Sequence, residues 1–129
     1  MCGDLKRIMV AEDDVMMQKL IRYSLEKLGG FTLKICPSGE DILGEMVDFK
    51  PDLFVLDVLM PEMDGPETLE KIRKEAGFES VPVVFLTAST YPDELARLKK
   101  TGVLDVISKP FNPKTLPDLM REKWQAYNA

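Results

Sequence analysis

The sequence contains no histidine and only two cysteines among its 129 residues. Without histidine, the chain cannot form a Ser-His-Asp or Cys-His catalytic site, a His-ligated zinc site or a phosphohistidine of its own. Cys2 and Cys36 are far apart and lack the spacing of a metal-binding pair, so we interpret them as free thiols. Several common classes of catalytic and metal site are therefore excluded.

Blocks of basic residues and long apolar runs are also missing. The net charge of -5 and the absence of a basic block argue against direct binding of DNA or RNA. Residues 1–7 lack the apolar core of a signal peptide, glycine is not at position 2 as N-myristoylation requires, and no run is long enough to span a membrane. We expect a cytoplasmic protein that binds neither nucleic acid nor a membrane.

The hydrophobic residues, 45% of the chain, are grouped in short runs separated by helical patterns. Strands are predicted at residues 7–11, 31–35, 52–57, 81–87 and 103–108. A helix pattern follows each strand, which predicts an α/β fold: a doubly wound, five-stranded parallel sheet with helices on both faces. There is no internal repeat or linker, so we expect residues 1–129 to form a single domain.

Capping residues and apolar spacing predict where the helices lie. Asp14 is expected to cap the first helix, which Gly29-Gly30 ends, and Ser38 the second. The second helix is expected to bury a stripe of four residues, Ile42, Leu43, Met46 and Val47. The third spans residues 66–75, and Thr90 and Pro92 open the fourth. The last begins either at Asn112-Pro113 or at Thr115, because Pro117 suits only a first turn.

Four chemically distinctive features follow successive strands. They are the acidic pair Glu12-Asp13, Asp57, Thr87 and the dipeptide Lys109-Pro110. Singly each is weak, since an acidic pair after a strand is more often a helix cap or solvated surface. In a parallel sheet, however, the carboxyl ends of the strands form one ligand-binding edge. We therefore expect these side chains to meet at that edge.

The chemistry of this set points to phosphoryl transfer. Converging carboxylates repel one another, and a divalent cation removes that conflict. Mg²⁺ suits the site because it binds a few carboxylates and keeps positions for water and phosphate oxygens. Lys109 adds an ammonium and Thr87 a hydroxyl donor, which together can neutralise a transferring phosphoryl group. Asp57 would be the nucleophile that forms an aspartyl-phosphate.

Taken together, these motifs resemble those of a known protein family. Residues 10–14, 56–65, 86–88 and 109–111 resemble the receiver domain of two-component response regulators, over essentially the whole chain. The resemblance implies the sheet order 2-1-3-4-5 and the following site residues. Asp57 is the phosphoacceptor; Asp13, Asp57, the Leu59 carbonyl and, through water, Glu12 bind Mg²⁺; Thr87, the Ala88 backbone and Lys109 hold the phosphoryl oxygens. It also implies a cis bond between Lys109 and Pro110.

The resemblance further implies partners and an output. A histidine kinase or a histidine phosphotransfer protein would supply the phosphoryl group, and the domain would catalyse its own phosphorylation and dephosphorylation. The downstream protein and the oligomeric state remain unassigned, and the chain is either a stand-alone receiver or a piece of a longer regulator. The usual output face comprises the fourth helix, fifth strand and fifth helix, which here include Tyr91, Leu95, Val106, Phe111 and Trp124, some of them expected in the core.

One position departs from the family pattern. Receivers generally carry Tyr or Phe three residues before the lysine, and that ring turns inward when the threonine moves. Here the position is Val106, which has no ring. The usual coupling of the threonine to an aromatic ring is therefore not expected here, whereas the phosphorylation chemistry is.

Other functional classes fit less well. A haloacid-dehalogenase phosphatase needs a second aspartate two residues after the nucleophile, and that position is Leu59. An FMN-binding flavodoxin would have a hydroxyl- or glycine-rich loop after the first strand, where this chain has residues 12–14, all acidic. A P-loop motif is absent. A purely structural interaction domain remains open, but it would not explain the joint presence of all four features.

Overall fold

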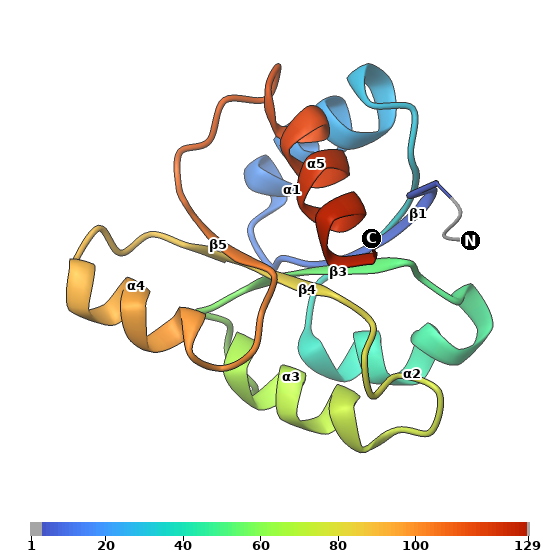
Figure 1. Cartoon of the computed structure of the whole chain (residues 1–129), viewed down its shortest axis with the longest axis vertical. Coiled ribbons are helices and arrows are strands. Elements are labelled where there is room, and N and C mark those ends of the chain that lie inside the picture. Colours follow the sequence, from blue (N-terminus) through green and yellow to red (C-terminus); the bar gives the residue numbers. More distant parts are fainter. Residues whose placement is uncertain (1–3, 129) are drawn as a thin grey trace.

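The computed structural model describes residues 4–128, so Cys2 lies outside the described residues. The described strands are β1 Arg7–Ala11, β2 Thr32–Cys36, β3 Leu53–Asp57, β4 Val83–Thr87 and β5 Asp105–Ser108. The helices are α1 Val15–Ile21, the π-helix η1 Arg22–Leu28, α2 Gly39–Phe49, α3 Gly65–Lys74, α4 Pro92–Lys99 and α5 Leu116–Asn128. All strand pairings are parallel, in the order β2-β1-β3-β4-β5 (Figure 1). The α/β fold and the sheet order predicted from the sequence are confirmed.

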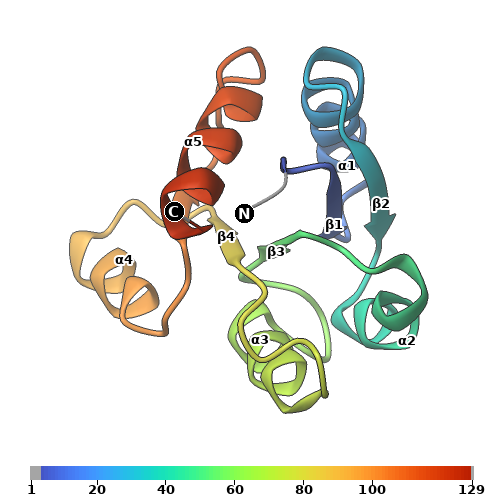
Figure 2. The same cartoon turned by 45° about the vertical axis from the view of Figure 1, so that its right-hand side comes forward.

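Helices cover both faces of the sheet (Figure 2). Successive residues of a strand point to opposite faces, and β1 shows this clearly. Ile8 and Val10 pack with residues of α1, η1 and α5, whereas Met9 and Ala11 pack with residues of α2, α3 and α4. The described residues therefore form two hydrophobic cores, one on each side of the sheet.

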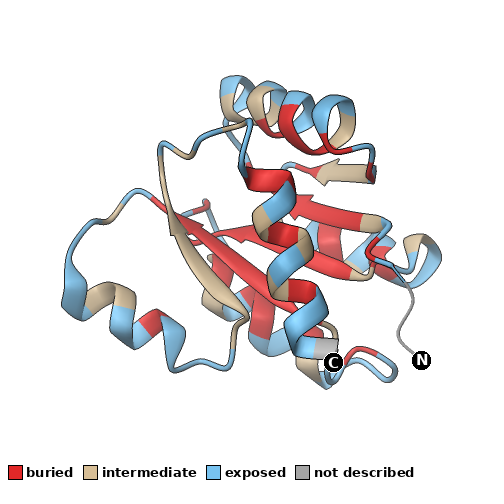
Figure 3. Ribbon diagram, turned by 45° about the horizontal axis from the view of Figure 1, so that its top comes forward, coloured by how far each residue is buried: buried red, intermediate tan, exposed pale blue. Residues whose placement is uncertain are grey.

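Strands β3 and β4, which end on Asp57 and Thr87, are buried along their whole length. Every residue of β3 and β4 is buried, while β5 at the sheet edge is half-buried throughout (Figure 3). A strand covered on both faces has no polar alternation, because neither face meets water. This explains why the sequence shows continuous apolar runs there, and why polar residues at the strand ends stand out.

The predicted helix caps form as expected at several points. The Asp14 carboxylate accepts the Met17 N–H, and the Ser38 hydroxyl accepts the Asp41 N–H. Each bond satisfies one of the N–H groups that a helix leaves unpaired in its first turn. Helix α5 begins at Leu116, after Thr115, with Pro117 in its first turn. The structure thus selects the later of the two predicted starts.

Three helical details differ from the predictions. Val47 was expected on the buried stripe of α2, but its side chain is 52% exposed, so that expectation is wrong. The first helix continues from α1 into the π-helix η1, which apolar spacing did not indicate. Tyr91, rather than Thr90, precedes α4, and it makes no side-chain cap. Among the described residues, no helix is both long and apolar enough to cross a membrane.

Candidate functional site

Three carboxylates converge at the carboxyl end of the sheet. Glu12 and Asp13 directly follow β1, and Asp57 ends β3. Because Ala11 pairs with Leu56 in the β1–β3 ladder, the next residue of each strand lies beside the other. One carboxylate oxygen from each of Glu12, Asp13 and Asp57 lies within 4.8 Å of the others. The convergence expected from the sequence is present in the fold.

The first of these carboxylates, Glu12, is fully buried and tightly held. Its N–H donates to the Cys36 carbonyl at 3.0 Å, and its own carbonyl accepts the Gln18 side-chain amide at 2.6 Å. Its carboxylate accepts the Asp14 N–H at 3.1 Å. Burial raises the pKa of Glu12 above its ordinary value, and neighbouring Asp57 adds to this, whereas a hydrogen bond from Lys109 opposes it. An additional positive charge at this position would favour the ionised form.

Lys109 lies between two of the carboxylates. Its Nζ is 2.9 Å from Glu12 Oε1 and 3.1 Å from Asp57 Oδ1. Burial by itself lowers the pKa of Lys109, but the hydrogen bonds to Glu12 and Asp57 outweigh burial, and the pKa is raised. The backbone N–H of Lys109 donates to the Thr87 carbonyl at 2.7 Å, and the Lys109–Pro110 bond is cis, as expected. The ammonium is therefore held at the site by backbone and side-chain contacts.

Thr87 ends β4 beside the end of β3. Leu86 pairs with Asp57 in the β3–β4 ladder, so Thr87 is one residue beyond that pair. Its side chain is buried, and its hydroxyl oxygen accepts the Ser89 N–H at 3.1 Å. Ala88, which follows, is exposed. The strand order thus brings Thr87 and Ala88 to the same edge as the carboxylates.

The loop between β3 and α3 carries Leu59 next to the site. The Leu59 side chain is 74% exposed, which is high for leucine. The loop returns tightly to the strand, because the Gly65 N–H donates to the Val58 carbonyl at 2.9 Å. A Cβ on Gly65 would lie 2.7 Å from the Asp57 carbonyl oxygen, closer than real Cβ atoms approach. Glycine at position 65 therefore allows the start of α3 to lie against the backbone carbonyl of Asp57.

Sequence reasoning missed several contacts that shape the site. Gln18 holds the Glu12 backbone from the next helix, and Cys36 supplies the carbonyl that accepts its N–H. Ser89 bonds to the Thr87 hydroxyl. The parallel β1–β2 pairing of Ala11 with Cys36 was the one available signal, since it follows from the predicted sheet order. The other two contacts depend on side-chain rotamers, which spacing does not indicate.

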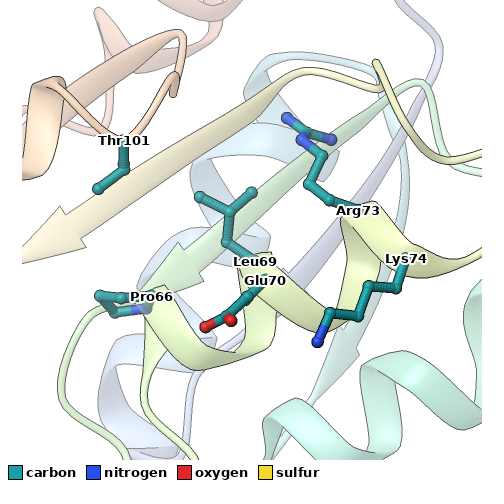
Figure 4. A pocket seen from close by; sticks show the side chains of 6 residues that line it. All are labelled: Pro66, Leu69, Glu70, Arg73, Lys74 and Thr101. Carbon is teal, nitrogen blue, oxygen red and sulfur yellow. The ribbon is translucent and has the colours of Figure 1, made fainter.

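A pocket of about 500 Å³ lies apart from the carboxylates (Figure 4). Its lining comes from α3 and from the turn after α4, and consists of Pro66, Leu69, Glu70, Arg73, Lys74 and Thr101. The Arg73 guanidinium is engaged by the Phe78 and Val81 carbonyls at 3.1 and 2.7 Å. None of the lining residues belongs to the acidic cluster, so this pocket and the carboxylates at the strand ends are separate features.

The donor set fits a hard divalent cation. Glu12, Asp13 and Asp57 offer only carboxylate oxygens, and the described residues of the cluster include no thiolate or imidazole. Such sites suit Mg²⁺, Ca²⁺ or Mn²⁺ rather than zinc or copper. The cluster can therefore bind a divalent metal ion.

Comparison with known protein families places these features in context. Residues 8–121 match the family described as the response regulator receiver domain. The chain belongs to this family. Receiver domains of two-component response regulators are phosphorylation-activated signalling modules, and the cluster of Glu12, Asp13 and Asp57 fits their phosphoacceptor site. The family suggested by the sequence motifs is thus confirmed.

Individual relatives agree with this assignment. Response regulator Rre1 of Synechocystis is 30% identical over 114 residues, which are 88% of this receiver and 49% of that protein. The receiver domain of the Francisella response regulator 1452 superposes with a TM-score of 0.83 at 25% identity, covering 94% of this chain and 98% of that one. The manganese-bound form of response regulator Rcp1 has a TM-score of 0.71 at 25% identity, covering 91% and 90%. The receiver spans about half the length of the curated relatives it matches.

The expected output face contains both surface and core residues. Tyr91 is 72% exposed, whereas Trp124 is buried in the core formed with α5. Leu95, Val106 and Phe111 are half-buried. The expectation that part of this set belongs to the core is confirmed, and Tyr91 is its most exposed member.

Proposed function

We propose that the receiver, as one domain over residues 1–129, accepts a phosphoryl group on Asp57 in the presence of Mg²⁺. The observation that carries this proposal is the position of Asp57. Its carboxylate lies within 4.8 Å of the Glu12 and Asp13 carboxylates and 3.1 Å from the Lys109 ammonium. A carboxylate surrounded by a cation site and a fixed ammonium is suited to act as a nucleophile on a charged phosphorus.

The metal ligands in this proposal are Asp13, Asp57, the backbone carbonyl of Leu59 and, through a water molecule, Glu12. The convergence of three carboxylates supports this set. The manganese-bound structure of Rcp1, a protein of similar fold, supports divalent cation binding at a receiver. Bound Mg²⁺ would supply neutralising charge for the phosphoryl oxygens. The residues of the chain would fix the carboxylates in place before the phosphoryl donor arrives.

Phosphorylation would proceed by direct attack of Asp57. A carboxylate oxygen of Asp57 forms a bond to phosphorus while the phosphorus–nitrogen bond of a donor phosphohistidine breaks. The electron pair of the broken bond stays on the donor imidazole, which takes up a proton from solvent. Lys109, the Thr87 hydroxyl and the Ala88 N–H would hold the phosphoryl oxygens as charge develops. In this sense the receiver would catalyse its own phosphorylation, and dephosphorylation by water.

The partners follow from this chemistry. The donor would be a histidine kinase or a histidine phosphotransfer protein, because the chain belongs to the receiver domains of two-component response regulators. The output would be contact with a downstream protein, without direct binding of nucleic acid or membrane by this chain. We place the receiver in the cytoplasm, where histidine kinases present their phosphohistidine. Leu59, an exposed apolar residue, opposes turnover of phosphate esters, because the phosphatase class needs an acid at that position.

The test is phosphorylation by a small donor. Incubation with acetyl phosphate and MgCl₂ should add the mass of one phosphoryl group, seen by intact-protein mass spectrometry, and EDTA should prevent it. Asp57→Asn should abolish the addition. Asp48→Asn, an exposed position on α2, is the matched control and should keep it. Full labelling of Asp57→Asn would overturn the assignment of the phosphoacceptor.

A further inference from the structure

Ser89, in the loop between β4 and α4, is a junction between three elements. Its N–H donates to the Thr87 hydroxyl at 3.1 Å, at the site. Its own hydroxyl donates to Glu94 Oε2 at 2.9 Å, in the first turn of α4. Its carbonyl accepts the Ser108 hydroxyl at 3.3 Å, from β5. One residue thus links the phosphoryl-binding threonine to the helix and strand of the expected output face.

The bond between Ser89 and Thr87 couples the loop to a side-chain rotamer. A threonine hydroxyl has one proton to donate and two lone pairs to accept with. In the structure, one lone pair of Thr87 accepts the Ser89 N–H, which leaves the proton free to donate to a phosphoryl oxygen. If the Thr87 hydroxyl moves toward Asp57, the Ser89 N–H must follow or lose its acceptor. Losing it would be unfavourable, because the group is partly buried.

The bond between Ser89 and Glu94 couples the loop to α4. The residue that caps this helix, Tyr91, has no side-chain capping bond, so the first turn is secured in another way. The Ser89 hydroxyl provides it, by accepting the Tyr91 N–H at 3.2 Å while donating to the Glu94 carboxylate. The second bond is charge-assisted and is therefore stronger than a neutral one. Movement of Ser89 should consequently displace the start of α4.

We propose that Ser89 and Glu94 are positioning residues that transmit the position of Thr87 to α4 when Asp57 is phosphorylated. This inference rests on the proposed function of Asp57. It also accounts for signalling without the usual aromatic residue, since Val106 has no ring to rotate. The hydrogen-bonded path from Thr87 through Ser89 to Glu94 does not require one. Phosphorylation biases the path because the Thr87 hydroxyl gains a partner only in the phosphorylated state.

The experiment separates binding at the site from the response of α4. Beryllofluoride with Mg²⁺ serves as the phosphoryl mimic, and its bound ¹⁹F NMR signal reports occupancy. Backbone amide shifts of Leu95 and Leu98, measured by ¹H–¹⁵N NMR, report α4. In the wild type both readouts should change. In Ser89→Ala and in Glu94→Ala, the bound ¹⁹F signal should persist while the α4 shift changes fall to less than about half.

Conservative variants distinguish a positioning role from a merely structural one. Glu94→Gln keeps an oxygen that can accept from Ser89 and should restore the α4 response, as should Ser89→Thr, which keeps a hydroxyl. Asp93→Ala, the exposed neighbour of Glu94 in the same turn, is the matched control and should respond like the wild type. Because Glu94→Ala alters only a helix side chain, it tests the path even if Ser89→Ala does not fold.

The outcomes are distinct. A full α4 response in both alanine variants, with the mimic bound, would overturn this inference and leave the phosphoacceptor assignment intact. Failure of Glu94→Gln to restore the response would also count against it, because an acceptor would then not be sufficient. Absence of the bound ¹⁹F signal in the wild type would instead refute the proposed function, and the inference with it.

Discussion

The Lys109 ammonium lies 2.9 Å from the Glu12 carboxylate, although the two residues are 97 positions apart in the sequence. The same ammonium is 3.1 Å from Asp57. It therefore neutralises part of an acidic cluster that would otherwise be strongly self-repelling. In the proposed function this group has a second role, as a contact for the phosphoryl oxygens. Neutralisation of the cluster and contact with the phosphoryl oxygens lead to different predictions, which can be tested separately.

Replacing Lys109 with alanine should remove the phosphorylation response without weakening metal binding. The ammonium competes with a cation for Glu12 and Asp57, so its loss leaves the carboxylates unneutralised and the Mg²⁺ affinity equal or higher. Mg²⁺ should accordingly raise the Tm of Lys109→Ala by at least as much as that of the wild type, because a ligand that binds only the folded state stabilises it. Labelling by acetyl phosphate should fall at least about tenfold, as expected for losing a charged transition-state contact.

Lys114→Ala is the control for this experiment, since Lys114 is exposed in the loop after Lys109. It should change neither Mg²⁺ affinity nor labelling. If Lys109→Ala lost Mg²⁺ affinity and labelling to the same degree, Lys109 would serve only to neutralise the acidic cluster.

Leu59 should control the lifetime of the phosphorylated state. The family resemblance implies that the positions two residues beyond the phosphoacceptor and two beyond the threonine, Leu59 and Ser89, flank the path of the hydrolytic water. The apolar Leu59 side chain cannot orient that water. Leu59→Asn is therefore expected to change the dephosphorylation rate of labelled protein while leaving the extent of phosphorylation intact. Leu28→Asn, also an exposed leucine but on η1, should leave the rate unchanged. Equal lifetimes for Leu59→Asn and the wild type would show that this side chain does not influence the water.

The close return of the chain at Gly65 gives a stability prediction. Alanine at position 65 would place a Cβ 2.7 Å from the Asp57 carbonyl oxygen and 3.0 Å from the Val58 Cα. Both neighbours are backbone atoms of β3 and its loop, so the variant should lose about 1–3 kcal/mol of unfolding free energy, as is typical of overpacking. Gly44→Ala, in open space on α2, should instead gain about 0.5–1 kcal/mol. Urea denaturation measures both. Similar stability for the two variants would contradict the close contact.

Cys36 should be an unreactive thiol. Burial raises its pKa to about 12, with a further contribution from Glu45, whose carboxylate accepts from the thiol at 3.6 Å. Iodoacetamide at neutral pH should therefore leave Cys36 unmodified in the folded protein and modify it after denaturation. Peptide mass spectrometry can locate the label, and rapid modification in the folded state would contradict the burial.

The same shift has a consequence for stability. A raised pKa in the folded state means that the neutral thiol is favoured by folding. The contribution of the neutral Cys36 thiol to the free energy of unfolding is fully present below the ordinary pKa of 9.0. It is lost as the pH rises through about 12. The decrease in Tm between pH 9 and pH 11 should thus be smaller in Cys36→Ala than in the wild type. The Tm difference at pH 8 between the two proteins serves as the reference.

Much of the fold could be predicted because burial on both faces leaves a strong pattern. Strands β3 and β4 are apolar up to their last residues, Asp57 and Thr87, so the limits of the strands and these polar residues are visible in the sequence. Local signals also located caps at Asp14 and Ser38, since a cap depends on residues three positions apart. Val47 shows the limit of such reasoning. Apolar spacing placed it on a buried stripe, but the width of that stripe depends on how α2 packs against the sheet.

The sequence by itself determined which chemical groups are available: three carboxylates, a hydroxyl and an ammonium at strand ends, and no histidine. It also determined that these groups lie at the same edge of the sheet, because parallel strands place their carboxyl ends at one edge. Only the tertiary structure decided which of these groups touch. In the folded chain, Lys109 lies between Glu12 and Asp57. Ser89 is hydrogen-bonded to both Thr87 and Glu94. These contacts depend on rotamers and loop paths over a few ångströms, which long-range packing selects and local patterns do not encode.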